Sequence, residues 1–238
     1  MTFLEKHGID ISRWQGDIDF SKLFGKIDFA IVRATYGTYL DTCAKKNLIA
    51  LNSSNIPAGL YAFSYALSEQ DAIAEADAVC DFAKDYKIDY PVYFDFEDAS
   101  AEYYKKQTGK NISKNFVTKI TSAFCKRVED NGYFAGFYAN KNFLNNYYDA
   151  DMPKQFALWY AFWNDECDKN CGMWQYSSTG KMVGIDGFVD ENICFVDYPS
   201  IIKDAGLNKS NYGSIEKIKK YIAEINAEIE RGEKNGFR

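Results

Sequence analysis

Short apolar runs alternate with segments of helical periodicity from the start of the chain to about residue 200. This alternation is typical of a parallel sheet whose strands are joined by crossover helices. The apolar runs predict eight strands, at residues 8–12, 29–35, 58–66, 91–97, 134–140, 157–163, 173–178 and 188–196. Eight strands alternating with helices favour an α/β barrel that closes on itself.

Two helices are marked by their caps and apolar stripes. Ser68 and Asp71 form a capping-box pattern, and apolar positions then recur at helical spacing as far as Ala83. Ser113 begins a second stripe, which ends before Gly132. Helical patterns are sparse after residue 140, so we expect an irregular barrel whose last three strands are joined mainly by loops.

Residues 205–238 have a different pattern. Five isoleucines repeat at alternating intervals of three and four residues, and Ser214 can cap the helix that they predict: Ile215, Ile218, Ile222, Ile225 and Ile229. We expect one domain over residues 1–204, followed by an amphipathic helical tail at 205–238. The tail either packs on the barrel, makes a homodimer contact or serves as a linker.

Composition narrows the classes of function. Of the 238 residues, 47% are hydrophobic and 17% aromatic, which is enough to bury a large core. The net charge of −6 argues against nucleic acid as a partner. The longest uncharged apolar run, residues 156–163, is too short to cross a bilayer, so we expect no membrane insertion. The first residues lack the apolar core of a signal peptide, which predicts synthesis in the cytoplasm.

The histidine and cysteine counts limit the chemistry. The only histidine is His7, whereas zinc hydrolases use two or three, and a Ser-His-Asp or Cys-His pair would have to rely on it. Of the six cysteines, Cys167 and Cys171 are close enough in sequence for a labile disulfide or half of a metal site. We expect reduced structural cysteines, no metal and no other cofactor. Glycine-rich phosphate loops do not occur, which disfavours nucleotide chemistry. Carboxylates are then the expected acid and base.

Two carboxylates lie close together in the apolar run PVYFDFE. Strand alternation places Tyr93, Asp95 and Glu97 on one face, with the Cα atoms of the two acids about 6.5 Å apart. Like charges at this spacing raise the pKa of one group and keep it protonated, as a general acid requires. Because the carboxyl ends of barrel strands form the active face, we expect both acids to line a pocket there.

Two further acids lie on the first and last predicted strands. Asp10 ends the first strand, and Asp190 lies near the last. Strands one and eight are neighbours in a closed barrel, so the two carboxylates are expected to meet. Each of these acids alone is equally compatible with a cap, a turn or a solvated charge. Together the four predict an acidic pocket.

Aromatic side chains follow the same strands. Tyr and Trp combine a flat apolar body with a polar tip, which suits the apolar face of a sugar ring. Most strand aromatics belong to a core, but six are candidates for a substrate cleft: Tyr61, Phe63, Tyr93, Tyr138, Trp159 and Trp174. We favour Tyr61, Tyr93 and Trp174 among them.

An ordered set of motifs over residues 7–197 resembles glycoside hydrolase family 25, the muramidases known from bacteriophage endolysins and bacterial autolysins. The motifs are GIDISRWQG (8–16), RATYG (33–37), GLYAF (59–63), DFE (95–97), GFY (136–138), LWYA (158–161), WQYS (174–177) and GIDGFVDEN (184–192). Arg33 and Gln175 lie in these motifs and complete the candidate substrate-binding set.

The resemblance implies a TIM-like (β/α)5(β)3 barrel that cleaves the β-1,4 bond between N-acetylmuramic acid and N-acetylglucosamine in bacterial cell-wall peptidoglycan. By match to the family pattern, Glu97 is the general acid and then the base. Asp95 assists a retaining reaction through the substrate N-acetyl group, a direct carboxylate nucleophile being the other mechanism considered. Asp10 and Asp190 tune this pair and hold substrate. The protein would reach the wall after lysis or by non-classical export.

Two positions depart from the family pattern. Arg13 stands where many members carry His, and Tyr36 stands where many carry Glu. Two other functions therefore stay open. One is a barrel that binds glycan without cleaving it, and the other is a chitinase or similar N-acetylhexosaminidase, which also pairs carboxylates at strand ends.

Overall fold

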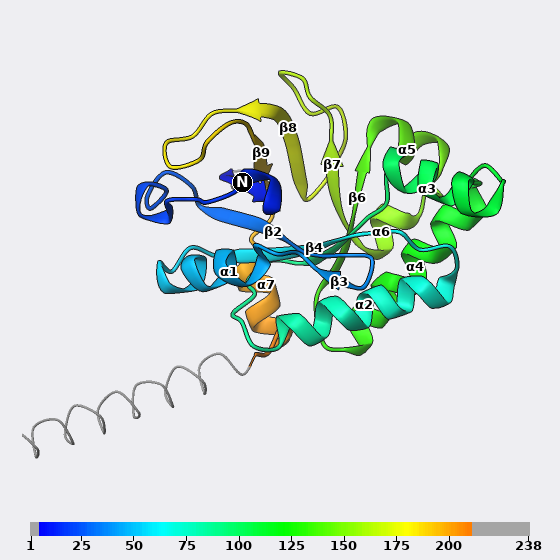
Figure 1. The fold of residues 1–238 in the computed structure, drawn as a ribbon, viewed down its shortest axis with the longest axis horizontal. Helices are drawn as coiled ribbons and strands as arrows, with labels where there is room; N and C mark the ends of the chain where they lie inside the picture. The colour runs from blue at the N-terminus through cyan, green and yellow to red at the C-terminus, as the bar shows by residue number, and fades with distance from the viewer. Residues whose placement is uncertain (1–4, 211–238) are drawn as a thin grey trace, which may run out of the picture.

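The computed structural model describes residues 5–210, which form a closed barrel with helices on its outside (Figure 1). Each of the eight predicted strands is present. They are β1 (Lys6–Ile11), β2 (Phe29–Tyr36), β4 (Ala58–Phe63), β5 (Val92–Asp95), β6 (Ala135–Asn140), β7 (Ala157–Ala161), β8 (Met173–Gly180) and β9 (Val189–Cys194). The hydrogen-bonded order is β1-β9-β8-β7-β6-β5-β4-β2, and pairing of β2 with β1 closes the barrel. The two-residue strand β3 (Tyr39–Leu40) pairs with β2 outside this ring.

The direction of β9 differs from the prediction. The barrel pairs from β1 through β8 are parallel, as expected, but β9 runs antiparallel to both β8 and β1. Only residues 181–188 join β8 to β9. A parallel crossover needs about a dozen residues or more, so a connection of this length has to return antiparallel.

Seven α-helices occur in the described residues: α1 (Ala44–Ser53), α2 (Glu69–Ala83), α3 (Asp98–Thr108), α4 (Lys114–Asp130), α5 (Lys141–Asn146), α6 (Met152–Gln155) and α7 (Tyr198–Ala205). The caps expected for α2 and α4 are confirmed, because Ser68 and Ser113 each accept a hydrogen bond from the backbone of the first turn. Short 3₁₀ turns also occur at η1 (Arg13–Gln15) and η2 (Phe20–Lys22). The connections after β6 contain only short helices, as expected.

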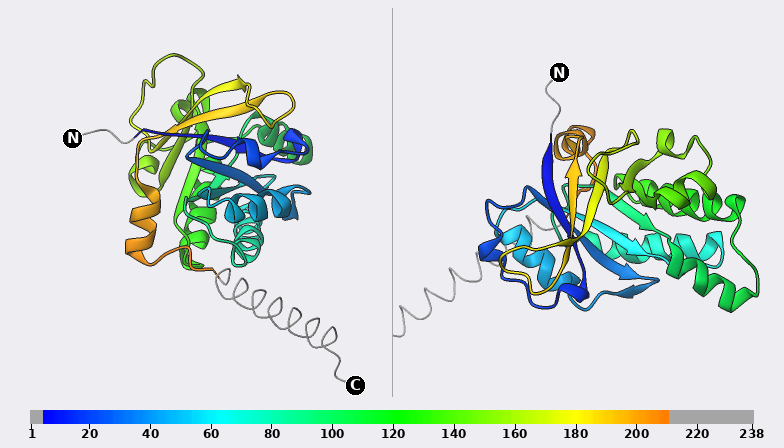
Figure 2. Two further views of the ribbon diagram at one scale, coloured as in Figure 1. Left: turned by 90° about the vertical axis from the view of Figure 1, so that its left-hand side faces the viewer. Right: turned by 90° about the horizontal axis from the view of Figure 1, so that it is seen from above.

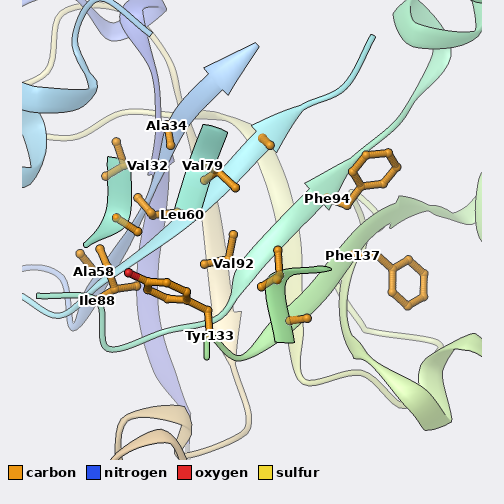
Figure 3. Close-up of a cluster of buried hydrophobic side chains, with 14 of the residues drawn as sticks. Val32, Ala34, Ala58, Leu60, Val79, Ile88, Val92, Phe94, Tyr133 and Phe137 are labelled. Carbon is orange, nitrogen blue, oxygen red and sulfur yellow. The ribbon is translucent and has the colours of Figure 1, made fainter. Parts of the chain in front are cut away.

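The main core lies between the outer face of the barrel and the helices. Figure 3 shows Val32, Leu60, Val92 and Phe94 of successive strands packed together with Val79 of α2. A second cluster, which includes Phe29, Tyr93, Trp159 and Tyr198, fills the barrel interior near the end where the parallel strands begin. With that end closed, the carboxyl ends of the strands are left to form a cavity.

The chain after β9 closes the lower end of the barrel, where α7 packs (Figures 1 and 2). Asn208 donates hydrogen bonds to the carbonyls of Ile88 (3.2 Å) and Tyr90 (3.0 Å) and accepts one from the Phe134 amide (2.8 Å). The isoleucine repeat predicted within the tail at 205–238 begins at Ile215 and lies outside the described residues, so the tail helix and the homodimer contact stay predictions.

The six cysteines are free thiols. Cys167 and Cys171 are closest, with 3.6 Å between their Sγ atoms. Within residues 5–210, none of the helices combines the length and the apolar character needed to cross a membrane.

Candidate active site

A cavity of about 350 Å³ opens at the carboxyl end of the parallel strands. All four predicted acids line it: Asp10, Asp95, Glu97 and Asp190. Six aromatic side chains also line it: Trp14, Tyr61, Phe63, Tyr138, Trp159 and Trp163. Arg33 and Gln175 are present as well. The barrel therefore brings most of the sequence-derived candidates to one place.

The junction between β5 and α3 positions the central pair of acids. β5 ends at Asp95, and Glu97 is the N-cap residue of α3. Phe96 between them is buried in the outer core, so the alternation of side chains leaves both acids facing the cavity. The backbone amide of Glu97 donates to Oγ of Ser100 (3.3 Å), which fixes the first turn of the helix. Both acids thus sit on a rigid element rather than on a long loop.

Burial sets the proton affinity of this pair. It raises the pKa of Glu97 to about 6, and repulsion from Asp98 and Asp190 adds to the effect. Burial also raises the pKa of Asp95 well above its ordinary value, with repulsion from Glu97 and Asp10 contributing, while the Arg33 charge opposes the shift. We expected an ionised Asp95 and a partly apolar cleft to raise the pKa of Glu97. Burial is the largest cause of that shift, and repulsion within the pair raises the pKa of Asp95 as well.

Asp10 and Asp190 meet as predicted, as direct partners across β1 and β9. Asp190 lies at the start of β9, and the antiparallel direction of that strand brings it to the same end of the barrel as Asp10. Burial, and then repulsion from Asp190, raise the pKa of Asp10 well above its usual value. Burial also raises the pKa of Asp190, and a hydrogen bond with Asp10 partly offsets this. The two carboxyls are therefore able to share a proton.

Two amide side chains fix the position of Asp10. Nε2 of Gln175 (2.9 Å) and Nδ2 of Asn192 (2.8 Å) both donate to its Oδ2 atom. Oε1 of Gln175 accepts from Tyr138 (3.2 Å) and from the Trp163 indole (3.2 Å), and Oδ1 of Asn192 accepts from the Trp159 indole (2.8 Å). One network therefore holds an acid and three aromatic rings in place, which pre-organises the cavity.

Arg33 brings positive charge to this acidic cavity. Its Nε atom donates to Oδ2 of Asp41 at 2.7 Å, and the same oxygen lies 2.7 Å from a terminal guanidinium nitrogen. Both side chains are buried. The ion pair fixes the guanidinium and leaves its charge close enough to lower the pKa of Asp95 in part.

Two predicted substrate-binding residues do not line the cavity. Tyr93 faces the barrel interior one step below Asp95, where Trp159 covers it at 5.3 Å between ring centroids. Trp174 precedes Gln175 on β8, and because Gln175 faces the cavity, alternation turns Trp174 to the outer core. Its indole donates to the Phe162 carbonyl at 2.7 Å. Both side chains therefore support the barrel without touching the cavity.

Several cavity residues were not among the sequence-derived candidates. Trp14 follows β1 in the turn η1, and Trp163 follows β7. Both are exposed on the cavity rim, at 72% and 62% of their surface. Asn192 does not line the cavity but holds Asp10 in place, and it lies two residues after Asp190 on β9, so strand alternation could have identified it. The two tryptophans lie in irregular segments where no periodicity points to a direction.

The chain resembles several known proteins. The protein YegX of Escherichia coli is 28% identical over 200 residues, covering 79% of this chain and 68% of the relative. Lysozyme M1 of Streptomyces globisporus is 25% identical over 200 residues, covering 78% and 66%. The modular autolysin LytC of Streptococcus pneumoniae has a solved structure with a TM-score of 0.69 and 26% identity. This match covers 79% of the present chain and 46% of LytC, so the chain spans about half the length of that protein.

The model of one protein family also matches the chain. It is described as glycosyl hydrolases family 25 and aligns with residues 9–185, which run from β1 to the loop before β9. This span exceeds half of the chain and contains Asp10, Asp95 and Glu97. The chain belongs to the glycosyl hydrolases of family 25.

Proposed function

We propose that this protein is a peptidoglycan muramidase, which hydrolyses the β-1,4 bond between N-acetylmuramic acid and N-acetylglucosamine. The observation that carries the proposal is the pair Asp95 and Glu97 at the floor of an aromatic-lined cavity, with the pKa of Glu97 raised to about 6. Two carboxyl groups flanking the scissile bond are what glycoside hydrolysis requires. Lysozyme M1 and the LytC autolysin, the latter also solved with a synthetic peptidoglycan ligand, support the choice of substrate.

In the proposed reaction, protonated Glu97 gives its proton to the leaving glycosidic oxygen and afterwards takes one from water. Asp95 orients the substrate N-acetyl group, whose carbonyl oxygen attacks the anomeric carbon, and it stabilises the positive charge that develops there. Burial raises the pKa of Asp95 well above its ordinary value, which favours the neutral acid in the free protein. When substrate is bound, the acetamide N–H and the developing positive charge favour the carboxylate, so Asp95 releases its proton to solvent and its negative charge then stabilises the transition state.

Asp10 and Asp190 have a supporting role in this proposal. Their shared proton keeps the floor of the cavity close to neutral when Glu97 is protonated, and it leaves hydrogen-bonding oxygens for the sugar. Tyr61, Phe63, Tyr138 and Trp159 supply apolar surface for sugar rings.

The test is digestion of purified bacterial cell walls followed by mass spectrometry of the soluble fragments. We expect new reducing ends on N-acetylmuramic acid and none on N-acetylglucosamine. Chitin, which lacks muramic acid, is the comparison substrate, and preferential cleavage of chitin would favour the N-acetylhexosaminidase alternative. Saturable binding of wall fragments without cleavage between pH 4 and 8 would instead identify a glycan-binding barrel.

A further inference from the structure

A second cavity of about 370 Å³ lies beside the first and takes no part in the proposed reaction. Four tyrosines from separate segments line it: Tyr36, Tyr39, Tyr65 and Tyr103. They come from β2, β3, the loop after β4, and α3. Glu75 of α2 also lines this cavity and is almost fully buried, at 3% exposed. We call this site the tyrosine pocket.

Aromatic contacts connect the tyrosine pocket with the active-site cavity. Phe63, which lines the active-site cavity, meets Tyr65 edge to face at 5.4 Å between ring centroids. Tyr65 in turn meets Tyr103 at 4.9 Å. Tyr103 belongs to α3, the helix that begins beside Glu97. Packed aromatic side chains therefore link the lining of the active-site cavity with the lining of the tyrosine pocket.

Arg13 links the two cavities on the other side. Its guanidinium lies 4.7 Å from the ring centre of Trp14, which lines the active-site cavity, and 5.2 Å from that of Tyr36, which lines the tyrosine pocket. Arg13 and Tyr36 therefore contact each other between the two cavities.

Glu75 gives the tyrosine pocket a polar group with spare hydrogen-bonding capacity. Its Oε1 atom accepts from the Tyr65 amide at 2.9 Å, but Oε2 has no hydrogen-bond partner among residues 5–210. The residue beside this carboxyl group is Gly37, which has a φ of +56°. A Cβ atom at this position would lie 3.8 Å from Oε1 of Glu75. Burial raises the pKa of Glu75 to about 7, the nearby Ser64 side chain and the Tyr65 amide oppose this shift, and repulsion from Asp71 adds to it. Below neutral pH the carboxyl group is therefore available as a donor.

We propose that the tyrosine pocket is a further glycan subsite, which binds an N-acetylhexosamine residue of the same strand that occupies the active-site cavity. The inference rests on the proposed function for the identity of the strand. The tyrosine rings pack against the apolar face of the sugar, and Glu75 hydrogen-bonds its acetamide group. Aromatic lining with one or two placed polar groups is typical of small-ligand sites.

The test measures kcat/KM on peptide-free glycan fragments of increasing length that alternate N-acetylglucosamine and N-acetylmuramic acid. The wild-type protein should gain in kcat/KM once the fragment is long enough to reach the tyrosine pocket. Tyr39→Ala and Tyr103→Ala should each remove about 5- to 10-fold of that gain, mainly through KM. Phe24→Ala is the matched control, since Phe24 is an exposed aromatic side chain that lines neither cavity. Full retention of the length dependence in both tyrosine variants would overturn the proposal.

Glu75→Gln provides a second readout that a merely structural role would not change. The titratable groups that line the pocket together with Glu75 are Asp71 on its own helix and the four tyrosines. The wild-type gain with length should fall as pH rises from 6 to 8, because Glu75 loses its proton. Glu75→Gln always carries a donor, so its gain should not change with pH. The same pH dependence in both proteins would contradict the role of Glu75.

Binding measurements separate this inference from the proposed function. If no glycan is cleaved, calorimetric titration of the same fragments still reports the subsite, and a weaker affinity of Tyr39→Ala for long fragments alone would support it. Absence of binding by every fragment would overturn both proposals. Normal cleavage with unaltered length dependence in the tyrosine variants would overturn only the subsite.

Discussion

Asp95 is the more deeply buried acid of the pair that it forms with Glu97. Its Oδ1 atom is buried and has no hydrogen-bond partner in the described part of the chain, and its pKa is raised well above the ordinary value. Asn has nearly the shape of a neutral Asp but cannot ionise. Asp95→Asn should therefore keep the thermal stability of the wild type while lowering kcat by about 10²-fold or more. Turnover within a few-fold of wild type would remove Asp95 from the mechanism.

Asp98 allows a test of how a neighbouring charge sets the pKa of Glu97. It is exposed at the start of α3, and its charge helps to raise the pKa of Glu97. Asp98→Asn should move the alkaline limb of the kcat/KM profile to lower pH and leave the maximum rate close to wild type. Asp204→Asn, an exposed change on α7, should not move it. An unshifted profile for Asp98→Asn would show that another group controls this limb.

Single residues also show what sequence alone can predict. The four acids and Tyr138 reach the cavity because strand alternation is strict once the strand is known. Strand alternation also places the neighbours Trp174 and Gln175 on opposite faces of β8. Because Gln175 lines the cavity, Trp174 cannot, and the sequence alone shows that both could not be substrate-binding residues. Tyr93 points to the barrel interior, as alternation predicts, but it lies below the cavity. How far a side chain lies below the cavity depends on how the lower end of the barrel is closed. That closure involves α7, which was not predicted although Asp197 caps its first turn and Gly206 ends it.

At the level of elements, the start of α3 couples the fold to the chemistry. Ser100 is buried, and its Oγ atom accepts the Glu97 backbone hydrogen bond. Ser100→Ala leaves that amide unpaired, which should lower the free energy of unfolding by about 1 kcal/mol and also lower kcat, because Glu97 is less well positioned.

Ser113→Ala is the matched control for this prediction. Ser113 caps α4 away from the cavity, with its Oγ atom accepting from Phe116 at 3.2 Å. Its removal should cost a similar free energy of unfolding with kcat preserved. Equal losses of kcat in the two variants would show that α3 has no special role. Denaturant unfolding and steady-state rates measure both quantities.

The helices differ in how readily their sequences reveal them. α2 and α4 have serine caps and long apolar stripes, and both were predicted. α3 was not predicted, although a capping box of Glu97 and Ser100 begins it and Gly109 ends it, because Ser100 is its only buried residue. α1 was missed because its N-cap, Cys43, makes no side-chain capping hydrogen bond.

At the level of the whole molecule, the buried acids predict how stability depends on pH. Burial raises the pKa of Asp10, Glu75, Asp95, Glu97 and Asp190, so above pH 4 the folded state binds more protons than the unfolded state. The free energy of unfolding should then fall as pH rises from about 4.5 to 7. Ion-paired acids such as Asp77 have lowered pKa values, so they change the free energy of unfolding only below this pH range.

Glu75 isolates one part of this effect. The pKa of Glu75 is raised from 4.5 to about 7. Ionising this group in the folded protein therefore lowers the free energy of unfolding by up to about 3 kcal/mol. Glu75→Gln should therefore be more stable than wild type at pH 8, with a smaller difference at pH 5. Urea unfolding at both pH values measures it. A wild-type stability that increases from pH 5 to 8 would contradict the account.

The barrel topology was largely predictable because eight apolar runs separated by helical segments admit few closed arrangements. The direction of β9 was not predicted, although the short segment 181–188 could have indicated it. The second cavity could not be foreseen, because its lining comes from β2, β3, α2, α3 and the loop after β4, whose relative placement depends on the whole barrel.

Glu97 is proposed to protonate the leaving group of the cleaved glycan. The most direct measurement compares Glu97→Gln with wild type on natural peptidoglycan glycan and on a synthetic glycoside whose leaving group needs no proton. Wild-type kcat/KM on natural glycan should fall as pH rises through about 6, the pKa of Glu97. Glu97→Gln should lose nearly all activity on natural glycan and recover part of the first step on the synthetic glycoside. Equal slowing on both substrates would show that Glu97 is not the general acid.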